Sequence, residues 1–159
     1  MRIQIERARP VDAPVIAELL GELLEEIMAA IDEKVFHFDR PATEQRAAAW
    51  LAAQKLLVWL AHDADSAQVL GFIAAYEGYA LYAGGEIGTI SELFVRARHR
   101  SQGVGRALLE TVADAARSRH WVRLEVTTPP LPHFDRTVAF YSRQGFSLSG
   151  GRKMKSTLW

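Results

Sequence analysis

The order of apolar and polar residues predicts an α/β (α+β) domain built on one mixed, mostly antiparallel sheet of about seven strands flanked by helices. Short segments that alternate apolar and polar residues, or that are compact apolar runs, recur along the chain, as in strands. Other segments between them have helical spacing or a helix-forming composition. No repeat, linker or low-complexity tract separates the 159 residues, so we expect one domain over 1–159.

The first half of the chain predicts a strand, two helices and a pair of strands, at 3–6, 12–27, 42–53, 56–61 and 69–79. Ile3 and Ile5 alternate with polar neighbours, which is typical of an edge strand. Asp12 is a residue type that caps helices, and Pro14 is tolerated in a first helical turn. The polar run at 62–66 predicts the turn between the paired strands.

The second half predicts a strand, a helix, a strand, a short helix and a final hairpin, at 87–95, 103–119, 122–126, 135–144 and 146–159. Asp135 is placed to cap the short helix, and Gly145 is a natural helix end. The proline-rich run at 129–132 ends the strand before it. The final hairpin is expected to turn at Gly150 and Gly151.

The composition excludes several classes of protein. Acidic and basic residues number 19 each, so we expect no nucleic-acid or membrane partner. The absence of cysteine removes a cysteine nucleophile, a thiolate metal site and any disulfide. The 5 histidines form no metal-binding spacing, and no apolar run is long enough to span a bilayer. We expect a cytoplasmic protein without a bound metal.

The segment that leads into the predicted helix at 103–119 has the features of an anion site. The first amide N–H groups of a helix lack partners and attract negative charge, and many helices place an acidic residue there. Here no carboxylate occurs between Glu92 and Glu110, and arginines occupy the stretch instead. Gly103 and Gly105 allow the backbone to approach a ligand closely. The pattern predicts a pocket for a pyrophosphate.

Other interpretations of this loop remain open. A solvated basic turn would also contain glycines, because short glycine motifs often occur without a ligand. A P-loop requires Gly-Lys-Ser/Thr, and the chain contains no such triplet. A dinucleotide fingerprint requires a third glycine where Leu108 stands. Glu125 has the spacing of its acidic residue, but the strand around Glu125 alternates instead of being apolar throughout.

Three motifs occur in register along the chain. They are the loop Arg100-Ser101-Gln102-Gly103-Val104-Gly105, the strand segment at 90–95 before it, and Phe140-Tyr141 followed by Gln144-Gly145-Phe146. Together with the opening at 7–13 they resemble the GCN5-related N-acetyltransferase (GNAT) superfamily, whose loop signature is Arg/Gln-x-x-Gly-x-Gly/Ala. The resemblance covers essentially the whole chain.

The resemblance implies a twisted sheet that splits near its middle and binds acetyl-coenzyme A (acetyl-CoA) in the split. By this analogy the backbone of Leu93, Phe94 and Val95 holds the pantetheine arm. The residues implied to hold the pyrophosphate are Arg100, Ser101, Gln102, Gly103, Val104, Gly105 and Arg106. The family often has asparagine where this chain has Phe134, so the chain departs from the family in its grip on the pantetheine arm.

The implied reaction is the attack of a primary amine on the acetyl thioester within a ternary complex, which needs no enzyme nucleophile. Glu92 is the candidate base. By strict alternation it shares a strand face with Ile90 and Phe94, and desolvation on an apolar face raises a carboxyl pKa toward the range that suits a base. A strand glutamate that pairs with an arginine is an equally open interpretation.

Tyr141 is the candidate acid through the resemblance. The ordinary tyrosine pKa of about 10 lies close to that of a thiol at about 8.5, so Tyr141 could return a proton to the departing thiolate. Without the resemblance, Tyr141 would be interpreted as an aromatic packing residue on a short helix. A bulge near Val95, as in the family, would direct a backbone N–H at the oxyanion.

The acceptor site is expected between the first two helices and along the turns of the sheet. Phe38, Tyr76 and Tyr79 are the candidate contacts, because aromatic faces suit a cationic amine. The same tyrosines could simply cover the sheet. The expected acceptor is a small-molecule or peptide amine of unknown identity. The length of the acyl group and the oligomeric state, including a homodimer, stay open.

Two rival functions remain. A non-catalytic acyl-CoA-binding sensor or interaction module of the same fold would keep the loop without needing Glu92 or Tyr141. A nucleic-acid-binding protein would use the basic run from Arg96 to Arg106, and its binding would depend strongly on salt.

Overall fold

Five strands form one sheet in the computed structural model, which describes residues 1–128 and 134–158. In spatial order they are β1 (Ile3–Arg7), β2 (Leu57–Asp63), β3 (Val69–Ala80), β4 (Gly85–Val95) and β5 (Leu124–Val126). β1 to β4 pair antiparallel, and β5 pairs parallel to β4, so the sheet is mixed as predicted. The chain divides into two compact units, Met1–Thr127 and Thr128–Trp159, and the sheet belongs to the first.

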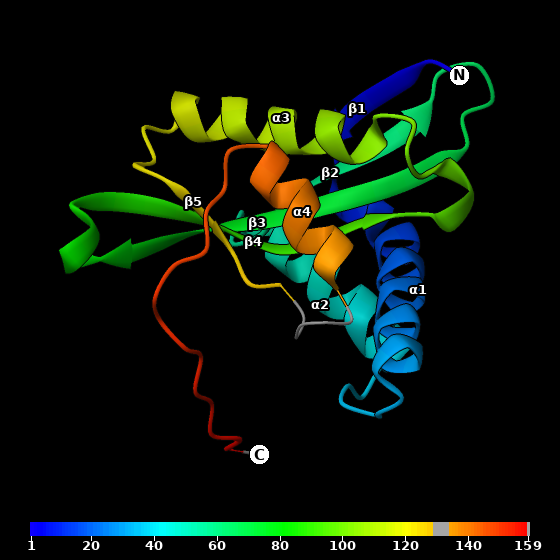
Figure 1. The fold of residues 1–159 in the computed structure, drawn as a ribbon. Helices are drawn as coiled ribbons and strands as arrows, with labels where there is room; N and C mark the ends of the chain where they lie inside the picture. Colours follow the sequence, from blue (N-terminus) through cyan, green and yellow to red (C-terminus); the bar gives the residue numbers. More distant parts are fainter. Residues whose placement is uncertain (129–133, 159) are drawn as a thin grey trace. The chain divides into compact units, whose positions relative to one another are not determined.

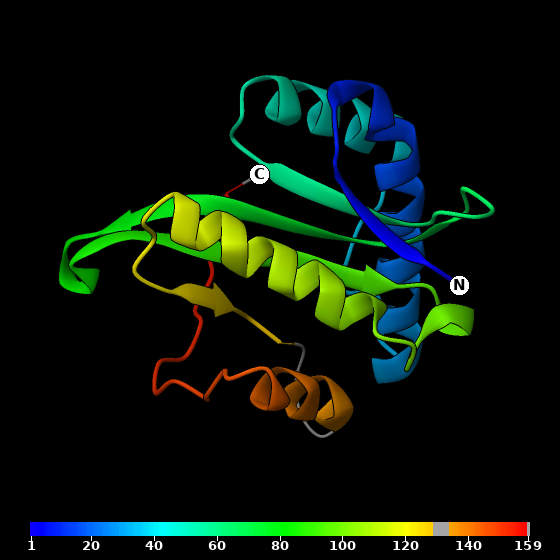
Figure 2. The same ribbon diagram turned by 90° about the horizontal axis from the view of Figure 1, so that it is seen from above.

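Helices cover both faces of the sheet in the first unit. α1 (Ala13–Ile31) and α2 (Arg40–Ala52) lie on one face, and α3 (Val104–Ser118) lies on the other (Figure 1). Figure 2, seen from above, shows α3 in front of the sheet. Short 3-10 turns at Pro10–Asp12, Leu81–Ala83 and Ala97–His99 precede α1, join β3 to β4 and follow β4. The central strands are therefore buried between two helical layers.

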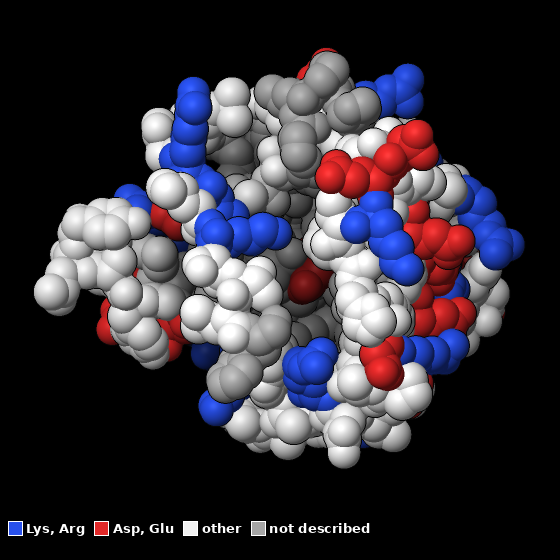
Figure 3. Space-filling model, turned by 90° about the horizontal axis from the view of Figure 1, so that it is seen from below, with Lys and Arg blue, Asp and Glu red and all other residues white. Residues whose placement is uncertain are grey.

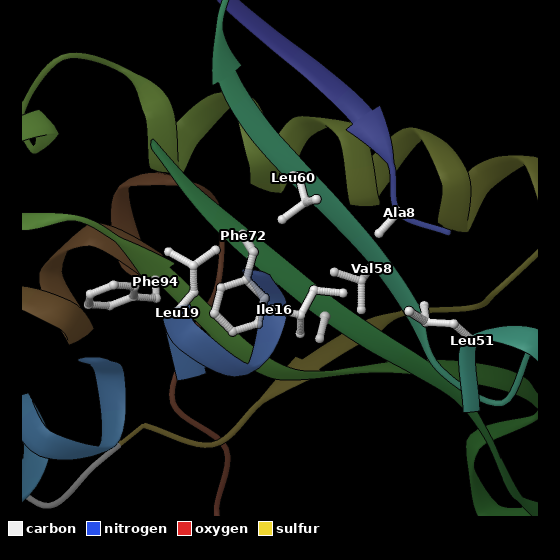
Figure 4. Packing of buried hydrophobic residues seen from close by; sticks show 9 residues of the cluster. Ala8, Ile16, Leu19, Leu51, Val58, Leu60, Phe72 and Phe94 are labelled. Atoms are coloured by element: carbon white, nitrogen blue, oxygen red, sulfur yellow. The ribbon is translucent and has the colours of Figure 1, made fainter. Parts of the chain in front are cut away.

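The face covered by α1 and α2 holds the main hydrophobic core (Figure 4). Leu60 pairs with Phe72, and Phe72 pairs with Phe94 on the other side. Paired residues of antiparallel strands point to the same face, so these three side chains form one layer. The helices complete the cluster with Ile16, Leu19 and Leu51.

The starts of α1 and α2 use their aspartates differently. The Asp12 carboxylate accepts the amide N–H of Arg9 at 2.8 Å and, within the described residues, caps no amide of α1. Asp12 thus occupies the predicted N-cap position of α1, but its side chain serves the 3-10 turn before the helix and not an amide of α1. At α2, the Asp39 carboxylate accepts the amide N–H of Ala42 at 3.0 Å, which is the usual cap.

The second unit contains α4 (Asp135–Arg143). Gly145 follows it with a φ of 93°, which confirms the predicted helix end. Asp135 occupies the first helical position and not the cap. The predicted strand end at 129–132 lies outside the described residues.

No strand forms in residues 146–158, so the two final strands and the count of about seven are wrong for the described residues. A strand needs a neighbour that takes up its backbone N–H and C=O groups, and an isolated two-stranded hairpin is at best marginally stable. The alternation around Phe146 and Leu148 supplies a local preference but no partner. Residues 147–158 are exposed.

Candidate functional site

The segment that joins β4 to α3 ends at an uncapped helix start. Gly103 occupies the N-cap position of α3 with a φ of 89°, and no side chain of the described residues caps the helix there. The first turn also contains no acidic residue. The first amide N–H groups of α3 are therefore left for an external anion, which fits the pyrophosphate predicted from the sequence.

The left-handed backbone explains why residue 103 is glycine. A Cβ at Gly103 would meet nothing within 4 Å, so space is not the constraint. A positive φ is costly for most residues, whereas glycine adopts it readily. Ser101 also has a positive φ, of 60°, so the loop turns sharply twice before α3 begins.

Two arginines of the segment 100–106 are engaged with carboxylates. Arg100 donates from Nη2 to Glu26 of α1 at 2.6 Å and from Nε to the Val95 carbonyl at 2.8 Å. Arg106 pairs with Glu110 of its own helix at 2.8 Å. A cation that already has a carboxylate partner is a weaker anchor for phosphate, so the anion site depends chiefly on amide N–H groups. The same pairing opposes the nucleic-acid interpretation.

The second half of β4 has a strand neighbour on one side only. β3 pairs with β4 along nearly its whole length, whereas β5 pairs with it only from Gly88 to Ile90. Among the described strands, none lies along the other edge of residues 92–95. A strand edge offers backbone donors and acceptors to an extended, amide-containing ligand. This edge contains Leu93, Phe94 and Val95, the residues predicted for the pantetheine arm.

Strand β4 carries a β-bulge at Ser91. Ala75 of β3 pairs with Ile90, and the preceding residue, Ala74, pairs with Glu92. Ser91 is thus an extra residue without a partner in β3, and an extra residue reverses the alternation of side chains along the strand.

The bulge decides which face Glu92 occupies. Glu92 and Phe94 point to the face covered by α1 and α2, while Ile90 points to the face covered by α3. The predicted common face of Glu92 and Phe94 is confirmed, and that of Glu92 and Ile90 is wrong. The family analogy places a bulge near Val95. The bulge in this structure lies four residues earlier, at Ser91.

The Glu92 carboxyl lies in surroundings that suit a base. Burial raises the pKa of Glu92 above its ordinary value, and the hydrogen bond from the Ser91 hydroxyl acts more weakly in the opposite direction. A carboxylate with a raised pKa accepts a proton more readily. Among the ion pairs of the described residues none involves Glu92, which opposes its interpretation as a structural partner of arginine.

Tyr141 of α4, in the second unit, is buried with 6% of its surface exposed. Its ring packs edge-to-face on Phe140 and Phe146, with ring centroids 5.3 and 5.4 Å away. Burial raises the pKa of Tyr141 to about 12. The gap to a thiol pKa of about 8.5 is therefore about 3.5 pH units, wider than for an exposed tyrosine.

The structure separates the residues predicted to contact the acceptor. Tyr76 shares the sheet face of Glu92 and lies two residues, about 7 Å, along β3 from the residue that pairs with Glu92. Tyr79 points to the opposite face, and its hydroxyl donates to Glu77 at 2.5 Å. Phe38 packs over α1, where a Cβ added to Gly21 would lie 2.9 Å from its ring.

A shallow hollow of about 350 Å³ lies at the turn between β3 and β4. Its lining residues are Tyr79, Ala80, Leu81, Gly84, Gly85 and Glu86. Glu86 is six residues from Glu92, or about 20 Å of strand. The hollow is therefore too distant to hold a compact amine against Glu92.

Sequence patterns do not single out two residues that the structure places beside the predicted site. Ser91 becomes relevant only through the bulge, which no local pattern predicts. Glu26 has a weak signal, because Glu18, Glu22 and Glu26 recur every four residues along α1 and so form one stripe.

Comparison with known proteins agrees with this geometry. A family model described as "Acetyltransferase (GNAT) domain" matches residues 54–148. An integron cassette protein from the mobile metagenome of Cole Harbour Salt Marsh is 26% identical with a TM-score of 0.80, and the match covers 98% of this chain and 91% of that one. That match shows a shared fold over nearly the whole chain.

Two structures below 25% identity share the fold. The ribosomal-protein-alanine N-acetyltransferase of Brucella melitensis biovar Abortus is 19% identical with a TM-score of 0.73, covering 98% of this chain and 100% of that one. An aminoglycoside acetyltransferase from an uncultured soil metagenomic sample, in complex with sisomicin, is 18% identical with a TM-score of 0.76, covering 99% and 97%.

Fold, loop and family match define an acetyl-transferring enzyme. The chain belongs to the GNAT acetyltransferase family, whose members use acetyl-CoA. Within residues 1–128 and 134–158, no group of three or more His, Asp or Glu side chains is arranged to hold a metal. In the same part of the chain, every helix is too short or too polar to cross a membrane.

Proposed function

We propose that this protein transfers the acetyl group of acetyl-CoA to a primary amine by direct attack in a ternary complex. The observation that carries the proposal is the uncapped start of α3 at Gly103, on the loop that follows the strand containing the half-buried Glu92. Family membership supports the reaction class, because GNAT enzymes transfer acetyl groups.

The loop and the edge of β4 would hold acetyl-CoA, which supplies an activated acetyl thioester. The amide N–H groups at the start of α3 would bind its pyrophosphate, since they have no side-chain cap among the described residues. The backbone edge at 93–95 would pair with the pantetheine arm. No bound metal is part of this proposal.

Glu92 would remove the proton of the amine, directly or through one water. Its raised pKa makes it a stronger base than an exposed glutamate, and its face of the sheet also carries Tyr76. The aromatic face of Tyr76, 42% exposed, would contact a cationic acceptor before the proton is lost. Phe38 is the second proposed contact, on the segment between α1 and α2.

Tyr141 is the proposed donor of a proton to the departing thiolate. A gap of about 3.5 pH units corresponds to about 5 kcal/mol against this transfer. The role therefore requires that binding of the substrates brings the pKa of Tyr141 closer to that of the thiol.

The proposed acceptor is a small-molecule or peptide amine. A thiol-release assay with acetyl-CoA against polyamines, amino acids, aminoglycosides and peptide N-termini tests the function. Release of CoA with one acceptor class supports the proposal. Tight CoA binding with no turnover across the panel would favour the non-catalytic acyl-CoA-binding module instead.

The anion site has a separate test at Gly103. Asp and Asn both tolerate a positive φ better than most residues, so Gly103→Asp and Gly103→Asn form a matched pair that differs in charge. We expect Gly103→Asp to weaken CoA binding at least about tenfold more than Gly103→Asn, because the carboxylate occupies the position of the anion. Titration calorimetry measures the CoA affinity of both variants. Equal affinities would mean that the pyrophosphate binds elsewhere.

A further inference from the structure

Helix α1 carries a stripe of glutamates that contacts the segment after β4. Glu18 and Glu22 both hold Nη2 of Arg96, at 3.0 and 2.9 Å. Glu26, one turn further along the stripe, holds Nη2 of Arg100 at 2.6 Å. Figure 3 shows acidic and basic side chains interleaved on the side of the molecule where α1 lies.

The two arginines have different surroundings. The Arg96 side chain is 17% exposed, has two carboxylate partners and also donates to the Val69 carbonyl at 3.2 Å. It therefore anchors the end of β4 to α1. The Arg100 side chain is 41% exposed and has Glu26 as its single carboxylate partner among the described residues.

Arg100 connects three parts of the proposed cofactor site. Its backbone belongs to the loop before α3, its Nε donates to the Val95 carbonyl, and its guanidinium lies 5.6 Å from the ring centroid of Phe94. Val95 and Phe94 belong to the β4 edge proposed for the pantetheine arm. Glu26 holds the other end of the guanidinium. One side chain thus links the phosphate loop, the strand edge and α1.

We propose that Arg100 is a positioning residue, held by Glu26, that sets the phosphate loop relative to β4, and that it is not a ligand of the pyrophosphate. The inference rests on the proposed binding of CoA and deepens it. The basic residue at this position of the loop would otherwise be interpreted as a direct phosphate contact. Its pairing with Glu26 and Val95 favours an indirect role.

The two roles predict opposite effects of Glu26→Gln on the affinity for CoA. If Arg100 were a phosphate ligand, loss of the Glu26 charge would release a full positive charge and tighten CoA binding. If Arg100 positions the loop, the same change loosens it and weakens binding. We expect the dissociation constant for CoA to rise about two- to fivefold, in line with a half-exposed ion pair.

The matched control is Glu18→Gln, which makes the same change on the same stripe of α1. Arg96 keeps Glu22 and the Val69 carbonyl in that variant, so we expect CoA affinity to stay at the wild-type value. Binding of CoA and of ADP is measured by calorimetry on the full chain, with thermal unfolding of each variant. ADP shares the pyrophosphate, so a displaced loop weakens both ligands.

A second variant keeps the test decisive if Glu26→Gln fails to fold. Arg100→Lys retains the positive charge but loses the planar guanidinium that bridges Glu26 and Val95. We expect weaker CoA binding here too, and a double variant with Glu26→Gln that is no weaker than Arg100→Lys alone. Unchanged or tighter binding in Glu26→Gln, or full affinity in Arg100→Lys, would overturn the positioning role. Wild-type protein that binds no CoA would refute the proposed function itself.

Discussion

Strand β4 and helix α4 each desolvate one titratable side chain, half-buried Glu92 and buried Tyr141, but the two surroundings differ in kind. Glu92 on β4 is desolvated and also receives a hydrogen bond from the neighbouring Ser91 hydroxyl, which favours its charged form. Tyr141 on α4 is raised to a pKa of about 12 by burial, with Phe140 and Phe146 packed edge-to-face on its ring. Desolvation pushes both groups toward their neutral forms, but among the described residues a donor that offsets this effect, the Ser91 hydroxyl, reaches only Glu92.

This difference separates a group suited to gain a proton from one reluctant to lose it. A half-buried carboxylate with a polar donor is typical of a general base, because it can ionise and yet bind a proton well. A tyrosine in an aromatic cluster is equally typical of packing. The following predictions test whether the contrast between Glu92 and Tyr141 holds, from the largest expected effect to the smallest.

Glu92→Gln should lower kcat/KM at neutral pH by about 100-fold or more, because glutamine cannot accept the proton of the amine. Thiol release over a range of pH measures this. The loss should shrink as pH rises toward the pKa of the acceptor amine, where the free amine needs no base. A loss of the same size at every pH would contradict the role.

The same variant supplies its own control for folding. Burial raises the pKa of Glu92 in the folded state, so its contribution to stability is present at low pH and is lost as pH rises through that pKa. Glutamine does not ionise, so Glu92→Gln does not lose stability as pH rises through that pKa. The variant should be at least as stable as wild type at neutral pH. Lower stability would mean that the activity was lost through unfolding.

Tyr141→Phe should remove an alkaline loss of stability. With a pKa of about 10 unfolded and about 12 folded, Tyr141 stabilises the protein below pH 10. That contribution falls by about 2 kcal/mol as pH rises to about 12. Urea unfolding at about pH 9 and about pH 12 should show this fall in wild type but not in the variant. If the free energy of unfolding changed equally with pH in wild type and in Tyr141→Phe, Tyr141 would not be desolvated in solution.

Tyr141→Phe should also lower kcat by about tenfold, less than Glu92→Gln, because a donor with a pKa near 12 is poorly matched to a thiolate. Steady-state kinetics at neutral pH measures the ratio of the two effects. A loss of kcat as large as that of Glu92→Gln would contradict the proposed difference between Glu92 and Tyr141. Unchanged turnover would refute the role of Tyr141 as an acid.

Ser91→Ala should give the smallest effect. Loss of the hydroxyl removes the hydrogen bond that lowers the pKa of Glu92, so that pKa should rise further. Glu92 acts as a base only when ionised, and the acidic limb of the pH–rate profile should therefore move to higher pH. Activity at neutral pH should change by less than about threefold. A shift to lower pH would contradict the assignment of this limb to Glu92.

Local order along the chain predicts much of the fold. The periodicity of apolar residues indicates α1 and α3, alternation indicates β1 and β5, and a compact apolar run indicates β2, because all three depend on neighbours a few residues apart. The anion site is local in the same sense. A glycine at the helix start and a first turn without acids are visible in the sequence, and the structure gives that glycine a φ of 89°.

Pairing between distant segments decides the rest. The face occupied by Glu92 depends on the bulge at Ser91, which exists only because β4 is aligned with β3. The carboxylate partner of Arg100, Glu26, comes from α1, 74 residues away. The final hairpin is absent because alternation supplies propensity but no partner strand. Contacts across long stretches of chain have no local signature, so a sequence pattern can propose a base at Glu92, while its burial, and hence its raised pKa, comes from the packed structure.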